Sequence, residues 1–265
     1  MPVKFKLPDN LTTFDYEKLV KETEIRKYDR YDKPVSYLDL VHTNTDGTKK
    51  NVPVMTAGNL SGVQGKAKSR KTFFLVLASS MIFAQKDIKI AIMDTEMFKY
   101  HSSLTLYRIN KLTPNNKLRF FNLRKYSIDV RLEFVETYIL RERPEILFLD
   151  NVRDCMIDIN SWTETNRILT TFIQLADDVG THICLTLHEN PGTDNDKARG
   201  AIGTEMQNKC ETVFRLEKDG DFTKVKGLFT RNMEFDSLEF NINPEGLPVL
   251  LSDFEAKRDE DVKPF

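Results

Sequence analysis

Residues 65–72, with the sequence GKAKSRKT, constrain the fold of this chain more than any other segment. A short apolar run, Gly58–Gln64, precedes them, and Phe73–Ala84, which is apolar nearly all round, follows them. This pattern predicts a buried strand, a tight turn and a buried helix, which is the context that a phosphate-binding loop requires. The predicted nucleotide-binding residues are Gly65, Lys66, Ala67, Lys68, Ser69, Arg70, Lys71 and Thr72.

The chemistry of such a loop follows from its position at the start of a helix. Consecutive backbone N–H groups and the positive end of the helix dipole attract the β- and γ-phosphates of a nucleotide. Lys71 would reach those phosphates as a point charge, and the Thr72 hydroxyl would bind Mg²⁺. The sequence therefore predicts ATP and Mg²⁺ as ligands, with Lys71 as a catalytic residue and Thr72 as a metal ligand.

One position departs from the usual phosphate-loop pattern, because Arg70 stands where a glycine normally precedes the lysine. A side chain fits there if it points away from the nucleotide, and a guanidinium group near phosphates is electrostatically acceptable. The departure nevertheless predicts weaker nucleotide binding. The alternative is that residues 65–72 form only a solvated basic turn before a helix.

An acidic residue at the end of another strand is needed to hold magnesium through water. The segment Ile146–Asp150 has four apolar residues and then a carboxylate, which is the Walker B pattern. We therefore predict Asp150 as the second metal-binding residue, with Asn151 and Asp154 supporting it. Any buried strand can end in aspartate, so the prediction depends on the phosphate loop that precedes it.

Two further strand ends carry polar side chains. Ile88–Asp94 is followed by Thr95 and Glu96, and the glutamate is well placed to polarise an attacking water. The alternative role for Glu96 is an acidic residue at a helix N-terminus. His182–Leu187 is followed by His188, which we predict as a catalytic-site sensor of the γ-phosphate rather than a structural histidine.

The alternation of strands and helices predicts an α/β fold with a mostly parallel central sheet, helices on both faces and C-terminal antiparallel strands. We expect a short helix at Phe14–Thr23, a hairpin turning at Asp46-Gly47 and a helix opened by Ser161. The proposed divisions are residues 1–52, an N-terminal extension; residues 53–251, the core domain; and residues 252–265, a charged tail. Further strands are expected at Leu118–Phe121, Glu211–Leu216, Lys224–Thr230 and Ser237–Ile242.

Composition excludes several classes of protein. The 39 Lys+Arg against 40 Asp+Glu give a net charge of −1, which excludes a globally basic coat for nucleic acid. No apolar run reaches the ~18 residues of a membrane span, and the polar first residues do not resemble a signal peptide. The three cysteines have no metal-ligand spacing. We expect a soluble, reduced, cytoplasmic protein without a membrane partner.

The order of these motifs resembles the RecA-like P-loop ATPases, especially the RepA-type hexameric plasmid-replication helicases and related ATPases of bacterial mobile elements. The resemblance covers roughly residues 53–243. It is carried by residues 65–72, residues 92–96, residues 147–150, residues 187–190 and residues 198–205.

The resemblance implies that the sensor strand lies between the phosphate-loop strand and the Walker B strand. It implies a homo-oligomer, such as a hexamer, in which a basic residue from one subunit reaches the nucleotide of its neighbour. Arg231 is our candidate for that residue, with Arg199 and Arg215 as rivals. Single-stranded DNA would pass the loop at residues 190–199, although its two basic and two acidic residues do not themselves indicate DNA binding.

Three functions fit these residues. The first is a helicase-like ATPase motor acting on DNA, in replication or mobilisation of a plasmid or mobile element. The second is a nucleotide-gated adaptor with weak hydrolysis, which the Arg70 departure would suit. The third is a small-molecule P-loop kinase, for which Arg119, Arg124 and Arg131 would have to supply the phosphate lid.

Overall fold

The computed structural model describes residues 16–189 and 200–251. The chain forms two compact units, which divide between Lys33 and Pro34. In the first unit, the helix α1 (Tyr16–Thr23) confirms the described part of the predicted N-terminal helix, and none of its residues is buried. The second unit contains all the other elements, and the prediction for the tail at residues 252–265 lies outside the described residues.

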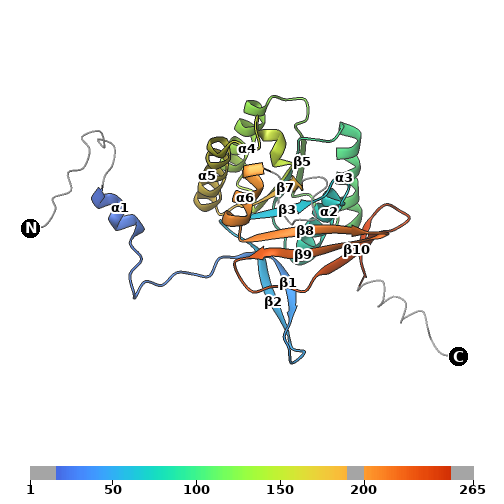
Figure 1. Cartoon of the computed structure of the whole chain (residues 1–265), viewed down its shortest axis with the longest axis horizontal. Coiled ribbons are helices and arrows are strands. Elements are labelled where there is room, and N and C mark those ends of the chain that lie inside the picture. Colours follow the sequence, from blue (N-terminus) through green and yellow to red (C-terminus); the bar gives the residue numbers. More distant parts are fainter. Residues whose placement is uncertain (1–15, 190–199, 252–265) are drawn as a thin grey trace, which may run out of the picture. The chain divides into compact units, whose positions relative to one another are not determined.

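A nine-stranded sheet forms the centre of the second unit (Figure 1). Its order is β11-β10-β9-β8-β3-β7-β6-β4-β5. The strands from β8 to β5 in this order run parallel, and β9, β10 and β11 are antiparallel. Their bounds are β3 Leu60–Gly65, β4 Ile90–Asp94, β5 Leu118–Asn122, β6 Ile146–Asp150, β7 His182–His188, β8 Thr212–Asp219, β9 Phe222–Thr230, β10 Leu238–Ile242 and β11 Pro248–Leu250. This arrangement confirms the predicted fold class, and β7 lies between β3 and β6 as expected.

Helices cover both faces of this sheet, because the central strands are apolar on consecutive positions. One buried cluster joins α2 and α3 to the sheet, and another joins α4, α5 and α6 to it. The bounds are α2 Lys71–Gln85, α3 Lys99–Leu112, α4 Ile128–Glu142, α5 Trp162–Val179 and α6 Gly200–Lys209, with a 3₁₀ turn, η1, at Val152–Cys155. None of the described helices is long and apolar enough to cross a membrane.

The predicted hairpin is present as β1 (Ser36–Thr43) and β2 (Lys49–Thr56), which pair with each other in a separate sheet. Its alternating apolar residues, including Leu38, Leu40 and Val54, are buried in the same cluster as α2. The hairpin therefore belongs to the second compact unit by its packing. The proposed division at residue 52 stays a prediction.

Capping residues mark both ends of α5. Ser161 accepts a hydrogen bond from the backbone of Glu164 at 3.2 Å, and Gly180 ends α5 with a φ of 80°. Ser127 precedes α4, but its side chain makes no capping hydrogen bond. The short edge strand β11 was not predicted, because three residues beginning with proline carry little sequence pattern.

Candidate active site

The loop between β3 and α2 has the coiled backbone expected of a phosphate-binding loop. Lys68 and Arg70 both adopt positive φ angles, of 64° and 67°. Gly65 has no space for a side chain, because a Cβ atom there would lie 2.5 Å from Ser69 Oγ and 2.7 Å from the Leu216 carbonyl. The loop therefore requires glycine at its first position, and α2 starts at Lys71, where its first N–H groups lack partners within the helix.

Arg70 occupies the left-handed backbone conformation that glycine usually supplies, at a cost of about 1–2 kcal/mol. Its side chain crosses to the turn between β8 and β9. There, Nη1 donates hydrogen bonds to the Asp221 carbonyl at 2.7 Å and to Thr223 Oγ1 at 3.3 Å. These contacts hold part of the guanidinium group on the neighbouring hairpin and partly offset the backbone cost.

Lys71 is buried at the start of α2, and its amine is fully engaged. Nζ donates to the carbonyls of Gly65 at 2.9 Å and Lys66 at 3.2 Å, and it lies 3.0 Å from Nδ1 of His188. Burial lowers the pKa of Lys71, while the negative charges of Asp150 and two nearby glutamates oppose that effect. The sequence predicts this cation at the loop, and the structure brings it into contact with His188.

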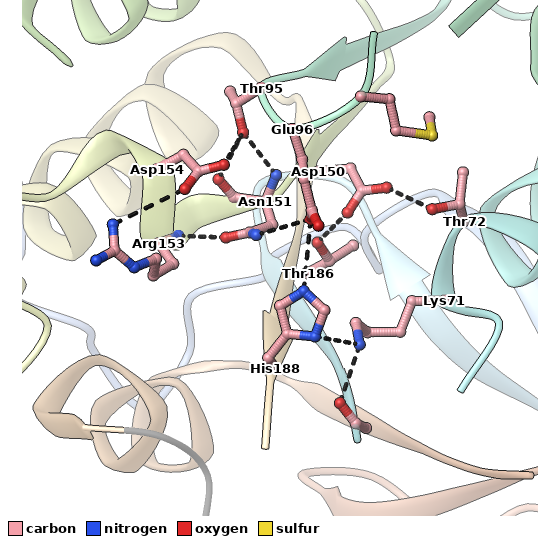
Figure 2. Close-up of polar contacts among 12 residues, drawn as sticks. Lys71, Thr72, Thr95, Glu96, Asp150, Asn151, Arg153, Asp154, Thr186 and His188 are labelled. Carbon is pink, nitrogen blue, oxygen red and sulfur yellow. Dashed lines mark hydrogen bonds and ion pairs between the residues drawn. The ribbon is translucent and has the colours of Figure 1, made fainter. Parts of the chain in front are cut away.

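Thr72 and Asp150 meet as the metal-site prediction requires (Figure 2). Thr72 Oγ1 donates to Asp150 Oδ2 at 2.9 Å, and the hydroxyl of Thr186 donates to Oδ1. Burial raises the pKa of Asp150, and the two threonine hydrogen bonds act in the opposite direction. The sequence analysis missed Thr186, although it lies two residues before His188 and so on the same face of β7.

Glu96 lies beside His188 and Asn151 at the ends of three neighbouring strands (Figure 2). Its carboxylate is 3.4 Å from His188 Nε2 and accepts a hydrogen bond from Asn151 Nδ2 at 3.2 Å. The hydrogen bond from His188, followed by that from Asn151, lowers the pKa of Glu96 to about 2 against the opposing effect of burial. Glu96 is therefore an ionised group that faces the loop, and it does not act as a helix cap.

Asp94 fixes the turn that presents Glu96. Its carboxylate accepts hydrogen bonds from the backbone N–H groups of Glu96 and Met97, both at 2.9 Å, and from the Ser102 hydroxyl. Burial raises the pKa of Asp94, and these hydrogen bonds partly compensate. Asp94 thus has a structural role, and α3 begins after this turn at Lys99.

A cavity of about 450 Å³ joins these groups. One end holds the charged residues of the loop together with Glu96, Asp150 and His188. The other end lies between α2 and α3, where its lining includes Phe73, Val76, Leu104 and Arg108. The Arg108 guanidinium lies 4.5 Å from the centre of the Phe73 ring and donates to the Gly246 carbonyl at 2.9 Å. The cavity therefore has a polar end and an apolar end.

The structure does not bring Arg231 to this cavity. Arg231 follows β9, next to the amino-terminal part of β3, and its Nη2 donates to the Lys209 carbonyl at 3.1 Å. Its rival Arg215 lies nearer the loop and forms an ion pair with Glu189 at 2.9 Å. Arg199 and the predicted DNA-facing loop at residues 190–199 lie outside the described residues.

No protein-family model and no curated protein matches the sequence. Among solved structures, the chain is similar to the flagellar accessory protein FlaH from Methanocaldococcus jannaschii, with a TM-score of 0.54 and 13% identity over 73% of this chain and 89% of that chain. It is also similar to the RadB recombinase, with a TM-score of 0.54 and 16% identity over 72% of this chain and 90% of that chain. The fold is RecA-like. At these identities the likeness concerns the fold alone.

Proposed function

We propose that this chain binds and hydrolyses ATP as a RecA-like motor that acts on DNA. The observation that carries the proposal is the meeting of Lys71, Thr72, Glu96, Asp150 and His188 at one end of a single cavity. These residues come from α2 and from the ends of β4, β6 and β7, or immediately after them. Ligands of open α/β sheets bind at this carboxyl edge, and the residue types suit phosphoryl transfer.

The loop offers hydrogen-bond donors to a triphosphate, and one of its buried polar atoms has no partner. The Ser69 hydroxyl is buried, and among the described residues it has no hydrogen-bond partner. The N–H groups at the start of α2 and the Lys71 amine add positive potential beside it. Phosphate oxygens would supply acceptors for these groups and release Lys71 from the carbonyls of Gly65 and Lys66.

Thr72 and Asp150 are the residues that would hold Mg²⁺. Within the two described stretches of chain, no group of three or more histidine, cysteine or acidic side chains gathers around a common point. A magnesium ion here would therefore depend on the nucleotide and water for its remaining ligands, as is usual for this ion. When bound, Mg²⁺ neutralises charge on the phosphates, while Glu96 orients and deprotonates the attacking water.

The apolar end of the cavity suits the base of the nucleotide. Phe73, Val76 and Leu104 provide apolar surface, and the Arg108 guanidinium lies against the Phe73 ring. Such surfaces favour a planar ring over solvent. The triphosphate would then extend from this end toward Glu96, which places its last phosphate beside the candidate water-activating group.

The proposal that DNA is the substrate rests on the resemblance to helicase-like ATPases and on the exposed surface at Ile157 and Trp162. The loop after β6 exposes Ile157, and the first residue of α5, Trp162, is also exposed, with exposed fractions of 82% and 54%. Gly200 packs against this loop, since a Cβ atom there would lie 2.5 Å from the Ile159 carbonyl. Gly200 therefore lies beside a loop that exposes apolar surface, and the Trp162 ring can stack on bases. We propose a homo-oligomer, with a hexamer as the form suggested by the resemblance, and a role in replication or mobilisation of a plasmid or mobile element.

One observation favours the nucleotide-gated adaptor as a second candidate. Arg70 replaces the usual glycine, and Lys71 is held by two carbonyls and His188 in the structure. Both features would slow turnover if phosphates failed to displace these contacts.

The deciding experiment measures ATP turnover by the full chain with and without single-stranded DNA. Turnover stimulated by DNA supports the motor, whereas ATP binding without turnover supports the adaptor. Turnover that requires a small acceptor molecule and ignores DNA would support a kinase and contradict the motor. The single tryptophan, Trp162, provides a parallel readout, because its fluorescence should change when DNA binds beside it.

A further inference from the structure

The segment from Met97 to Ile128 contains seven lysines and arginines and no aspartate or glutamate. The whole chain has 40 acidic residues in 265, so about five would be expected in these 32 positions. The segment covers α3, β5 and the loop before α4. The chain as a whole has no excess of positive charge, but this segment has a local excess.

The fold gathers this segment at one edge of the central sheet. β5 is the last strand at that end, and α3 packs beside it (Figure 1). At the carboxyl ends of the strands, Asn122 Nδ2 donates to the Met97 carbonyl at 2.8 Å and to Ser102 Oγ at 2.6 Å. The start of α3 and the loop after β5 are therefore joined directly.

Most of the positive charge here is free of carboxylate partners. Lys117 pairs with Asp87 at 2.6 Å, and Arg108 lines the candidate active-site cavity, where it lies over the Phe73 ring. In residues 16–189 and 200–251, no carboxylate forms an ion pair with the five remaining lysines and arginines of the segment. These five are Lys99, Lys111, Arg119, Arg124 and Lys125.

Exposed aromatic side chains lie among these cations. On α3, Tyr100, Tyr107 and Lys111 follow one another at helical spacing on the face opposite the buried Thr105 and Ile109. Tyr100 and Tyr107 have exposed fractions of 64% and 56%. The neighbouring Phe98 and, after β5, Tyr126 are also exposed, with fractions of 64% and 43%.

The loop after β5 is held rigidly, so its side chains have a defined place. The guanidinium group of Arg131 donates hydrogen bonds to the carbonyls of Leu123, Arg124 and Asp154. Lys125 lies over the ring of Tyr126, 5.0 Å from its centre. Arg131 therefore fixes the backbone of this loop, in which Leu123 is buried while Arg124, Lys125 and Tyr126 are exposed.

We propose that this basic aromatic edge, formed by Lys99, Tyr100, Tyr107, Lys111, Lys125 and Tyr126, binds single-stranded nucleic acid. Unpaired cations attract the phosphate backbone, and exposed rings stack on bases without regard to sequence. The edge begins three residues after Glu96, on the turn that Asp94 fixes, so a bound strand would lie close to the candidate active site. The inference rests on the proposed function for its link to ATP turnover, but strand binding itself is independent of hydrolysis.

The test measures the binding of the full chain to a fluorescent oligothymidylate of about 20 nucleotides by anisotropy, without nucleotide, at several salt concentrations. The parent should bind, and Lys99→Glu with Lys125→Glu should weaken binding about tenfold or more. Removing two phosphate contacts should also reduce the slope of log affinity against log salt by about 1.4. Lys50→Glu, an exposed lysine on β2, is the matched control and should bind like the parent.

A second pair of variants tests stacking without changing charge. Tyr100→Ala should lower affinity about fivefold or more, and Tyr100→Phe should retain it because the ring remains. Equal binding by the parent, the double charge reversal and Tyr100→Ala would overturn the proposal, as would a parent that does not bind at low salt.

Native mass measurement separates strand binding from contact between copies of the chain. If the double variant changes the oligomeric state, anisotropy is repeated at a concentration where parent and variant are both monomeric. Weaker binding by the variant there supports the proposal, and equal binding assigns the edge to subunit contact and overturns it. Strand binding without ATP turnover would support this inference while contradicting the motor. A failure of the proposed nucleic-acid site can therefore be told apart from a failure of the proposed ATPase function.

Discussion

The Lys71 amine and the His188 ring are in direct contact, with Nζ 3.0 Å from Nδ1. A protonated amine can only donate, so Nδ1 accepts and the ring proton is on Nε2, which faces Glu96 at 3.4 Å. His188 therefore bridges the cation of the loop and the candidate water-activating carboxylate. Phosphates that draw Lys71 away would change the hydrogen bonding of His188, which gives a physical route from nucleotide binding to Glu96.

Lys71→Ala should abolish stabilisation by Mg-ATP, because the main positive charge for the β- and γ-phosphates is lost. In the parent, ATP at a hundred times its Kd should add about 2.7 kcal/mol to the free energy of unfolding. That corresponds to a rise in Tm of about 5–10 °C for a domain of this size. A thermal-shift titration checks this, with Lys50→Ala as the control that should respond like the parent. An unchanged shift in Lys71→Ala would refute the assignment.

Glu96→Gln should retain ATP binding and lose hydrolysis by about 10²–10⁴-fold, since the amide keeps its size but cannot accept a proton. Turnover and nucleotide affinity are measured on the same preparation. Glu133→Gln, an exposed residue of α4, serves as the control. Turnover equal to that of the parent would leave Glu96 without a catalytic role.

Asp150→Asn should raise the Mg²⁺ concentration needed for half-maximal turnover by about 10–100-fold, the usual effect of removing a group that positions a metal ligand. The amide oxygen can accept one of the two threonine hydrogen bonds and the amide NH2 can donate to the other hydroxyl, but the side chain lacks the negative charge. Magnesium titrations of ATP binding and turnover check this. Asp129→Asn, at an exposed site, should leave both curves unchanged, and the same result for Asp150→Asn would contradict the metal-site prediction.

The positions of the site's motifs along the sheet edge could be predicted from the sequence, because each motif ends a short apolar strand. Parallel strands place their carboxyl ends at one edge, so Gly65, Asp94, Asp150 and His188 had to converge once those strands were recognised. The placement of β7 between β3 and β6 came from the family resemblance. Strand periodicity alone does not determine the order of strands.

The side-chain contacts could not be predicted, because they depend on tertiary geometry. Nothing local indicates that Arg70 reaches Thr223 or that Lys71 meets His188, residues more than a hundred positions away. Thr186 was missed because one hydroxyl within an apolar strand is a weak pattern. The basic aromatic edge could be predicted only in part: the stretch without acidic residues at 97–128 is visible in the sequence, but only the fold shows that the start of α3 meets the loop after β5.

His182 should make the fold less stable in acid. Its ring is buried, with Nδ1 2.8 Å from the Thr56 carbonyl and Nε2 2.8 Å from Ser61 Oγ. Burial lowers its pKa from 6.5 to about 4. Between these values the unfolded chain binds a proton that the folded chain does not, so stability falls as the pH falls through this window. The loss is about 1.4 kcal/mol per pH unit at most, or about 3 kcal/mol in all.

The neighbouring Glu211 acts in the opposite direction, because burial raises its pKa and the folded chain then takes up its proton first. A comparison with His182→Gln separates the two groups, since the amide can make both hydrogen bonds and does not titrate. Urea unfolding at pH 7.5, 6 and 5 should show a smaller loss in the variant than in the parent. Identical losses would assign the acid sensitivity to other groups.

The position of Arg231 in the fold determines which nucleotide it could contact. Thr230, just before it, pairs with Thr212, which lies level with Ser61, four residues before Gly65 on β3. At about 3.3 Å per residue, roughly 13 Å of strand separates this level from the start of the loop. If Arg231 contacts a γ-phosphate, that nucleotide therefore belongs to a neighbouring subunit. The fixed fork of an arginine can hold two phosphate oxygens, and a finger supplied in trans is worth ~10³-fold or more in rate.

Mixing Arg231→Ala subunits with Glu96→Gln subunits tests this arrangement. Each variant alone should be inactive, because every interface lacks one of the two groups. Mixed oligomers should regain part of the parent's turnover, since some interfaces then combine an intact Glu96 with an intact Arg231 from the next subunit. Arg167→Ala, at an exposed arginine of α5, is the control and should be active alone. Full activity of Arg231→Ala by itself would exclude it as the finger and direct attention to Arg215, which lies nearer the loop.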